Sequence, residues 1–176
     1  MQKDFSYSLN SNPFLLGNLW DASFSQVDSY IAENLIPFGA PVILGTDPVR
    51  QVKLATTGAT ATSFLGIALR QNHLSSGGVL ATNNTGEQPV IMSTAVEAYP
   101  VGSPIAIARS GRVVISVNTV TQNVVGTTRA VYTMATGLIT TQTAAATNGT
   151  QLDLGFVLTV PVAGQLCAIQ INKLLQ

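Results

Sequence analysis

Charged residues are scarce in this chain of 176 residues. They make up 9% of the sequence, eight basic and eight acidic, so the formal net charge is zero. An ordinary soluble domain carries about 25% charged residues. Binding to nucleic acid or to an anionic membrane depends on an excess of positive charge, so we expect neither partner. A surface with so little charge is expected to be covered largely by another protein.

Cysteine, histidine and tryptophan occur once each, as Cys167, His73 and Trp20. A single cysteine cannot form an internal disulfide bond, and the apolar neighbours of Cys167 predict a buried thiol. One histidine and one cysteine, 94 positions apart, provide no metal-ligand spacing. We therefore expect neither a bound metal nor a cofactor.

Motifs of catalysis are lacking as well. The sequence has no Gly-x-Ser-x-Gly elbow and no phosphate-binding loop that ends in Gly-Lys-Ser or Gly-Lys-Thr. Strand alternation would place Glu87 and Glu97 on one face, but only 6% of the residues are aromatic and could flank a sugar. The sequence therefore predicts a protein without catalytic residues or enzymatic activity.

The sequence also lacks long hydrophobic runs. No apolar stretch approaches the roughly 20 residues of a membrane-spanning helix. The first residues, Met1–Asp4, do not combine a basic region with an apolar stretch, so we expect no secretory signal and synthesis in a reducing cytoplasm.

The N-terminal part of the chain differs from the rest. All threonines lie at Thr46 or later, and residues 1–33 carry one lysine against four acids, a net charge of −3. Apolar residues from Phe24 to Ile31 recur every three to four positions, and Asp21 precedes them as a candidate N-cap. This pattern predicts one short amphipathic helix over about residues 22–34.

Before that helix, residues 5–20 contain large apolar side chains with no clear period. They indicate an extended arm that docks on another subunit, with packing on its own domain as the alternative. The candidate partner-binding residues are Phe5, Phe14, Leu15, Leu16 and Trp20.

From Leu35 onward, short runs rich in valine, isoleucine and threonine alternate with turn residues. Strands are predicted near residues 41–45, 49–54, 63–70, 89–96, 104–108, 112–117, 129–134, 138–141, 154–160 and 165–172. Tight turns at Arg109–Gly111 and Met134–Gly137 predict two hairpins. The predicted fold is all-β: residues 35–176 form a small β-barrel or jelly-roll-like sandwich, preceded by the arm and helix of residues 1–34.

Two features of this β-region concern surfaces. Phe38–Leu44 (FGAPVIL) matches Val101–Ile107 (VGSPIAI), which predicts that the same barrel corner is used twice. Arg109, Arg112 and Arg129 flank the predicted hairpin strands and are expected to form salt bridges to a partner rather than a nucleic-acid track.

Several motifs occur in an order that resembles a known family. They are IPFGAPV at Ile36–Val42, FLGIAL at Phe64–Leu69, YPVGSPIAI at Tyr99–Ile107, GRVV at Gly111–Val114, AVY at Ala130–Val131–Tyr132, TG at Thr136–Gly137 and GQLCAI at Gly164–Ile169. Over about Ile31 to Asn172 the chain is similar to the bacteriophage structural cement proteins. Residues 1–30 match no motif of that family.

The resemblance implies a β-barrel or jelly-roll-like subunit bound to the outer surface of an HK97-type capsid, with the major capsid protein as its partner. It implies that the subunit is made in the host cytoplasm, bridges neighbouring capsid subunits and has no catalytic residues. We also expect self-association, with a homotrimer favoured over a dimer, and binding by apolar area and strand addition.

Two other functions stay open. A receptor-binding or fibre-like adhesin of the virion would need aromatic side chains in its loops, and residues 71–88 and 142–151 have none. A small hydrolase is disfavoured by the missing catalytic motifs.

Overall fold

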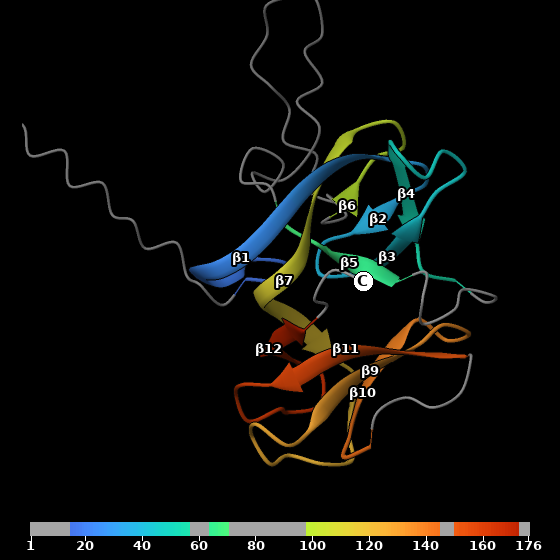
Figure 1. Cartoon of the computed structure of the whole chain (residues 1–176). Helices are drawn as coiled ribbons and strands as arrows, with labels where there is room; N and C mark the ends of the chain where they lie inside the picture. Colours follow the sequence, from blue (N-terminus) through green and yellow to red (C-terminus); the bar gives the residue numbers. More distant parts are fainter. Residues whose placement is uncertain (1–14, 57–63, 71–97, 145–149, 173–176) are drawn as a thin grey trace, which may run out of the picture.

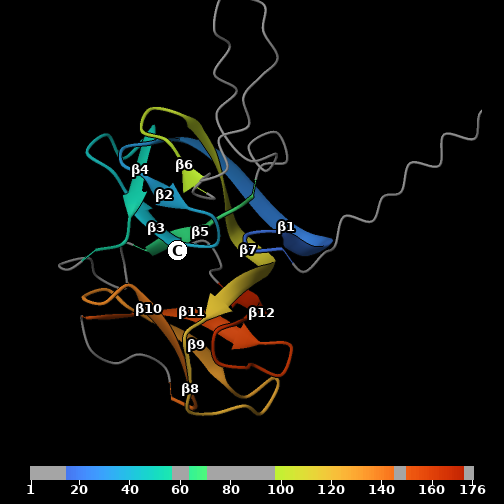
Figure 2. The ribbon, with the colours of Figure 1, turned by 180° about the vertical axis from the view of Figure 1, so that it is seen from behind.

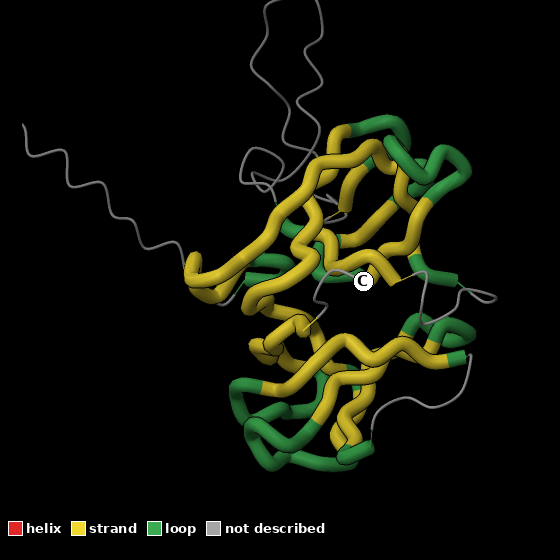
Figure 3. Tube along the Cα trace, viewed as in Figure 1, coloured by secondary structure: helices red, strands yellow, loops and turns green. Residues whose placement is uncertain are grey.

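Twelve β-strands and their connecting turns make up the described parts of this computed structural model, which are residues 15–56, 64–70, 98–144 and 150–172 (Figures 1 and 3). In chain order the strands are β1 (Leu19–Ala32), β2 (Ile36–Pro37), β3 (Pro41–Leu44), β4 (Gln51–Leu54), β5 (Phe64–Ala68), β6 (Ala98–Tyr99), β7 (Pro104–Val117), β8 (Thr119–Val120), β9 (Arg129–Thr133), β10 (Leu138–Gln142), β11 (Gln151–Val157) and β12 (Gln165–Asn172). The predicted all-β class is confirmed. The strand predicted at 89–96 lies outside the described residues.

Five strands close into a barrel, in the order β1-β4-β3-β5-β7, because β1 also pairs with β7. The β1–β4 pair is parallel and the β1–β7 pair is antiparallel. The barrel occupies the upper half of Figure 1. Its interior is filled by a cluster of buried side chains, namely Ala32, Ile36, Phe38, Val42, Val52, Leu65, Ala68, Tyr99, Ile105 and Ile107.

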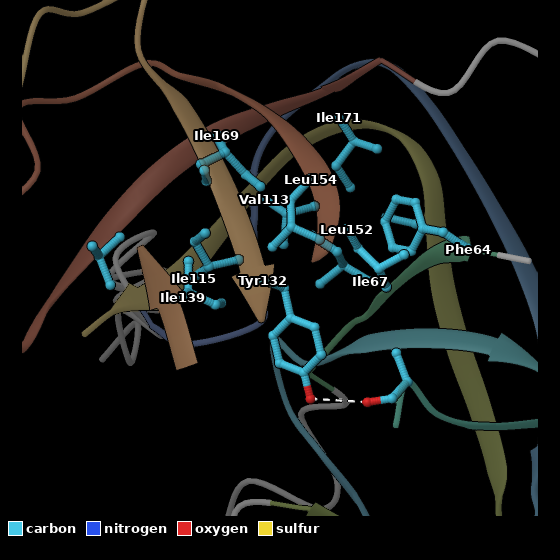
Figure 4. Close-up of a cluster of buried hydrophobic side chains, with 14 of the residues drawn as sticks. Phe64, Ile67, Val113, Ile115, Tyr132, Ile139, Leu152, Leu154, Ile169 and Ile171 are labelled. Carbon is cyan, nitrogen blue, oxygen red and sulfur yellow. Dashed lines mark hydrogen bonds between the residues drawn. The ribbon is translucent and has the colours of Figure 1, made fainter. Parts of the chain in front are cut away.

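The second half of β7 leaves the barrel and starts a further sheet, in the order β7-β12-β11-β9-β10-β8. Figure 2 shows β8 at the foot of this lower sheet. The lower sheet packs against the barrel through a second core, in which Phe64 and Ile67 of the barrel meet Val113, Leu152 and other lower-sheet residues (Figure 4). Tyr132 crosses the same interface and donates a hydrogen bond of 3.0 Å to the carbonyl of Ala55.

Strand β7 corrects one predicted hairpin. Arg109–Gly111 is not a turn, because β7 runs from Pro104 to Val117 without interruption. On one side of it, β1 pairs with residues on both sides of Gly111, which holds a left-handed φ of 121° in the middle of the strand. Partner strands therefore override the local turn signal, and Gly111 bends the strand instead of reversing it. The other predicted hairpin, β9 to β10, is confirmed.

Strand β1 corrects the predicted helix. Residues 22–34 form no helix, and Leu19–Ala32 are a barrel strand. From Gln26 to Ala32 the side chains alternate between the more buried and the exposed face, as a strand requires. An isolated helix of about 13 residues is marginal, whereas β7 and β4 supply hydrogen bonds on both edges of this segment. Tertiary pairing therefore overrides the three-to-four residue spacing.

The sequence repeat corresponds to two equivalent turns, which confirms the prediction that one corner is used twice. The first turn is Pro37–Ala40 and the second turn is Pro100–Ser103. In each, the fourth residue donates its N–H to the proline carbonyl over 3.2 Å, and the glycine has φ of 72° or 77°. This is the type II pattern. Antiparallel pairing of β2 with β6 relates the two turns by a local two-fold through Ile36 and Tyr99.

Candidate partner-binding surfaces

The arm meets the folded part of the chain in a tight turn at Leu15–Asn18. Asn18 donates its N–H to the carbonyl of Leu15 over 2.9 Å, and Gly17 donates to Val114 over 2.8 Å. The carbonyl of Gly17 accepts a hydrogen bond of 2.8 Å from Arg70. These bonds hold the first described residues against the folded part, and Leu15 is 37% exposed.

The five candidate binding residues are not equivalent in the structure. Leu16 packs against its own barrel, since a Cβ atom added to Gly39 would lie 2.6 Å from its Cδ1 atom. Trp20 is half-buried in β1. Leu15 is at the exposed root of the arm, and Phe5 and Phe14 lie outside the described residues. The partner-binding role of this set stays a prediction.

An apolar groove of about 270 Å³ lies between the barrel and the lower sheet. Leu16, Phe38 and Leu54 line it from one side, and Tyr132 and Ile139 line it from the other. Its described lining includes no charged residue, and its tyrosine hydroxyl is already bonded to Ala55. This groove is suited to an apolar side chain and offers no group for acid–base chemistry.

A second apolar surface lies in the loops of residues 121–127 and 158–164. The two loops are neighbours, because Gly126 donates its N–H to the carbonyl of Val157 over 2.9 Å. They expose four valines by 44–62%, namely Val124, Val125, Val160 and Val162. Neither loop contains a charged residue. Isolated valines among turn residues give no periodic signal, so the sequence did not reveal this surface.

The arginines expected to reach a partner are instead bonded within the chain. Arg109 forms a 3.0 Å salt bridge with Asp28 that ties β7 to β1. Arg129 pairs with Asp153 on the neighbouring strand β11. Arg112 donates a hydrogen bond of 3.2 Å to the side chain of Gln170. Arg109 and Arg129 are thus paired with acids of this chain, and salt bridges from the three arginines to a partner stay a prediction.

The outer edge of β10 is covered where it pairs with β8, at Thr140 and Thr141. The barrel is closed by the β1–β7 pair, and the outer edge of β10 is covered by β8. Next to β8, the side chain of Asn118 accepts the N–H of Ile139 over 2.8 Å, and Thr121 donates its hydroxyl to the carbonyl of Thr141. The expected binding by strand addition therefore has no open edge at β10.

Reactive groups are few in the described residues. No three histidine, cysteine or acidic side chains of these residues lie close enough together to hold a metal ion. Cys167 is fully buried, as predicted, and burial raises the pKa of its thiol. His73, Glu87 and Glu97 lie outside the described residues. The described part of the chain contains no helix that is long and apolar enough to span a membrane.

Together, the barrel and the lower sheet make this an all-β protein with apolar side chains exposed on both parts. The chain matches the family of structural cement proteins that includes E217 gp24 and Pam3 gp6, over residues 3–172. It therefore belongs to the phage structural cement protein family, a class of capsid components of the virion. The match also covers residues 3–30, in which the sequence analysis found no motif of the family.

No curated protein matches the chain. Among solved structures, the chain is similar to the N base of head fibre gp8.5 of bacteriophage phi29, with 12% sequence identity and a TM-score of 0.42, over 86% of this chain and 99% of that chain. The family match alone carries the assignment.

Proposed function

We propose that this protein binds the outer surface of a phage head and stabilises the shell by bridging neighbouring major capsid subunits. The observation that carries the proposal is the family match over residues 3–172. A subunit that binds only the assembled shell shifts the equilibrium toward the closed particle by mass action. The interface that it adds must be lost before the shell opens.

Bridging requires contacts at two separate places, and the chain offers them. The folded part presents exposed apolar side chains, and the arm of residues 1–14 starts from the fixed turn at Leu15. Fourteen extended residues span at most about 46–50 Å. In this proposal the folded part binds one capsid subunit and Phe5, Phe14 and Leu15 bind the next one.

Binding would proceed through apolar area rather than through ion pairs or added strands. The arginines Arg109 and Arg129 already have partners within the chain. A buried side chain of the size of phenylalanine or leucine contributes about 1.5–3 kcal/mol. Two or three such anchors are enough to dominate the affinity of one subunit.

The test uses shells of the parent phage assembled without this protein. Purified protein is added, bound protein is measured by co-sedimentation, and shell opening is followed by calorimetry. The proposal predicts saturable binding and a higher opening temperature. A matched chain that starts at Leu15 should bind more weakly and leave the opening temperature nearly unchanged. Binding to host cells without binding to shells would contradict the proposal and favour an adhesin.

A further inference from the structure

The two equivalent turns differ in one respect, which is how far they are covered. In the first turn, Phe38 is 2% exposed and Gly39 is buried. At the matching positions of the second turn, Val101 is 67% exposed and Gly102 is exposed. A Cβ atom added to Gly102 would meet no heavy atom within 4 Å. Two turns with one backbone geometry therefore have opposite surroundings.

The first turn is covered on two sides. The Phe38 ring packs in the barrel core against Tyr99, with ring centroids 5.2 Å apart, and the segment Leu16–Gly17 covers the backbone at Gly39. Leu16 lies on Gly39, and a Cβ atom added to Gly17 would be 3.0 Å from the backbone nitrogen of Gly39 and 3.1 Å from the Cβ atom of Phe38. This is a close contact between backbones, with a leucine side chain beside it. Gly17 holds φ of 78° and is fixed by two backbone hydrogen bonds. An apolar side chain followed by glycine is thus the chemistry that fits this turn.

The second turn sits in an apolar patch that the described residues leave open. Ala32 bonds to Gly102 and Ser103 through its carbonyl and N–H, over 2.7 and 3.0 Å, and so holds the turn against the end of β1. Around it, five apolar residues are exposed, and we call them the turn patch: Ile31, Leu35, Pro100, Val101 and Pro104.

Charge also limits what can bind there. No member of the turn patch is charged, and the carboxylate of the neighbouring Glu33 accepts hydrogen bonds of 2.7 and 2.8 Å from Thr46. Arg50 lies at the border, where its carbonyl accepts the N–H of Ile31. An apolar centre with a polar border is the usual anatomy of a protein–protein contact. The complementary surface is therefore an uncharged segment.

We propose that the turn patch is a capsid-binding site, which takes a turn of the major capsid protein that presents a leucine-sized side chain followed by glycine. This segment does at the second turn what Leu16–Gly17 does at the first. A second copy of this chain cannot supply the same segment, because its Leu16–Gly17 is engaged on its own first turn. The assignment rests on the proposed function and names the contact of the folded part.

The test compares two exposed apolar side chains in the full chain. Val101→Asp places a charge in the turn patch, and Leu138→Asp places one on β10, at a 42% exposed leucine that belongs to none of the surfaces described above. Circular dichroism and thermal melting should be unchanged in both variants. For shells assembled without this protein, Kd should rise at least about tenfold for Val101→Asp and less than about threefold for Leu138→Asp. Val101→Ile should bind as the wild type does.

Each other outcome overturns the inference. If the wild type and Val101→Asp bind shells equally well, the turn patch is not a capsid-binding site, and the proposed function is unaffected. Equal loss in both aspartate variants shows that the patch is not specific. A change of oligomeric state in Val101→Asp, measured by analytical ultracentrifugation, assigns the patch to a second copy. If the wild type itself does not bind shells, the proposed function fails and this site fails with it.

Discussion

Removal of residues 1–34, which include β1, should unfold the barrel, whereas removal of residues 1–14 alone should not. A chain that starts at Leu35 lacks the strand that pairs with both β7 and β4. It loses four backbone hydrogen bonds at Ile31–Glu33 besides those of the β1–β7 ladder, each of which contributes about 0.5–1.5 kcal/mol. It also opens the barrel beside Ile105 and Ile107, which are buried now.

The magnitude decides the outcome. Exposure of these two isoleucines costs about 1.5–3 kcal/mol each, so the bonds and side chains together amount to about 5–12 kcal/mol. This is comparable to the whole free energy of unfolding of a domain, about 5–15 kcal/mol. A chain that starts at Leu15 keeps all of these contacts.

Far-UV circular dichroism and urea unfolding of both truncated chains provide the test. The chain from Leu15 should show the β-type spectrum and the urea midpoint of the full protein. The chain from Leu35 should show no cooperative transition. A cooperative, β-rich chain from Leu35 would refute the reasoning and would return residues 15–34 to the role of a detachable arm.

Three further predictions concern stability and assembly. Gly155→Ala should lower the free energy of unfolding by at least about 2 kcal/mol more than Gly164→Ala in urea titrations. Both glycines have positive φ, but only at Gly155 would a Cβ atom lie 2.0 Å from the carbonyl oxygen of Gln170. Equal losses in the two variants would contradict this. Burial raises the pKa of Tyr99 from 10.0 to about 12, so the unfolded chain releases that proton first. The contribution of Tyr99 to the free energy of unfolding should therefore be constant below pH 10 and fall by about 1.4 kcal/mol per pH unit from pH 10 to 12. Tyr99→Phe should remove this part of the slope, and an unchanged slope would contradict it. Light scattering after size exclusion should show an oligomer, a trimer rather than a dimer, and a strict monomer at tens of micromolar would count against self-association.

The sequence predicts most strands because their signal is local. Pro41–Leu44, Arg129–Thr133 and Gln165–Asn172 lie where short β-branched runs end at turn residues. The errors are at β1 and β7, where local signals for a helix and a hairpin compete with pairing between segments about 80 residues apart. The sequence pattern predicted a barrel but not these distant partners, so the place of β1 in the barrel and the bend at Gly111 became visible only in three dimensions.

The candidate site shows the same division. The repeat of the Gly-x-Pro turn was visible in the sequence, and so was the apolar character of Leu15 and Leu16. The sequence could not show that Leu16 covers the first of the two turns, whereas Val101 in the second turn is exposed. That difference depends on the path of the chain before β1, which is fixed by hydrogen bonds from Gly17 to residues distant in sequence.

The most direct test of the account is a cryo-electron microscopy reconstruction of shells saturated with the full protein. The account predicts density for the barrel and the lower sheet on the outer surface of the head, with one subunit in contact with two neighbouring major capsid subunits. Density on a single capsid subunit would contradict bridging. Protein located on the tail, or absent from saturated shells, would contradict the capsid-binding role itself.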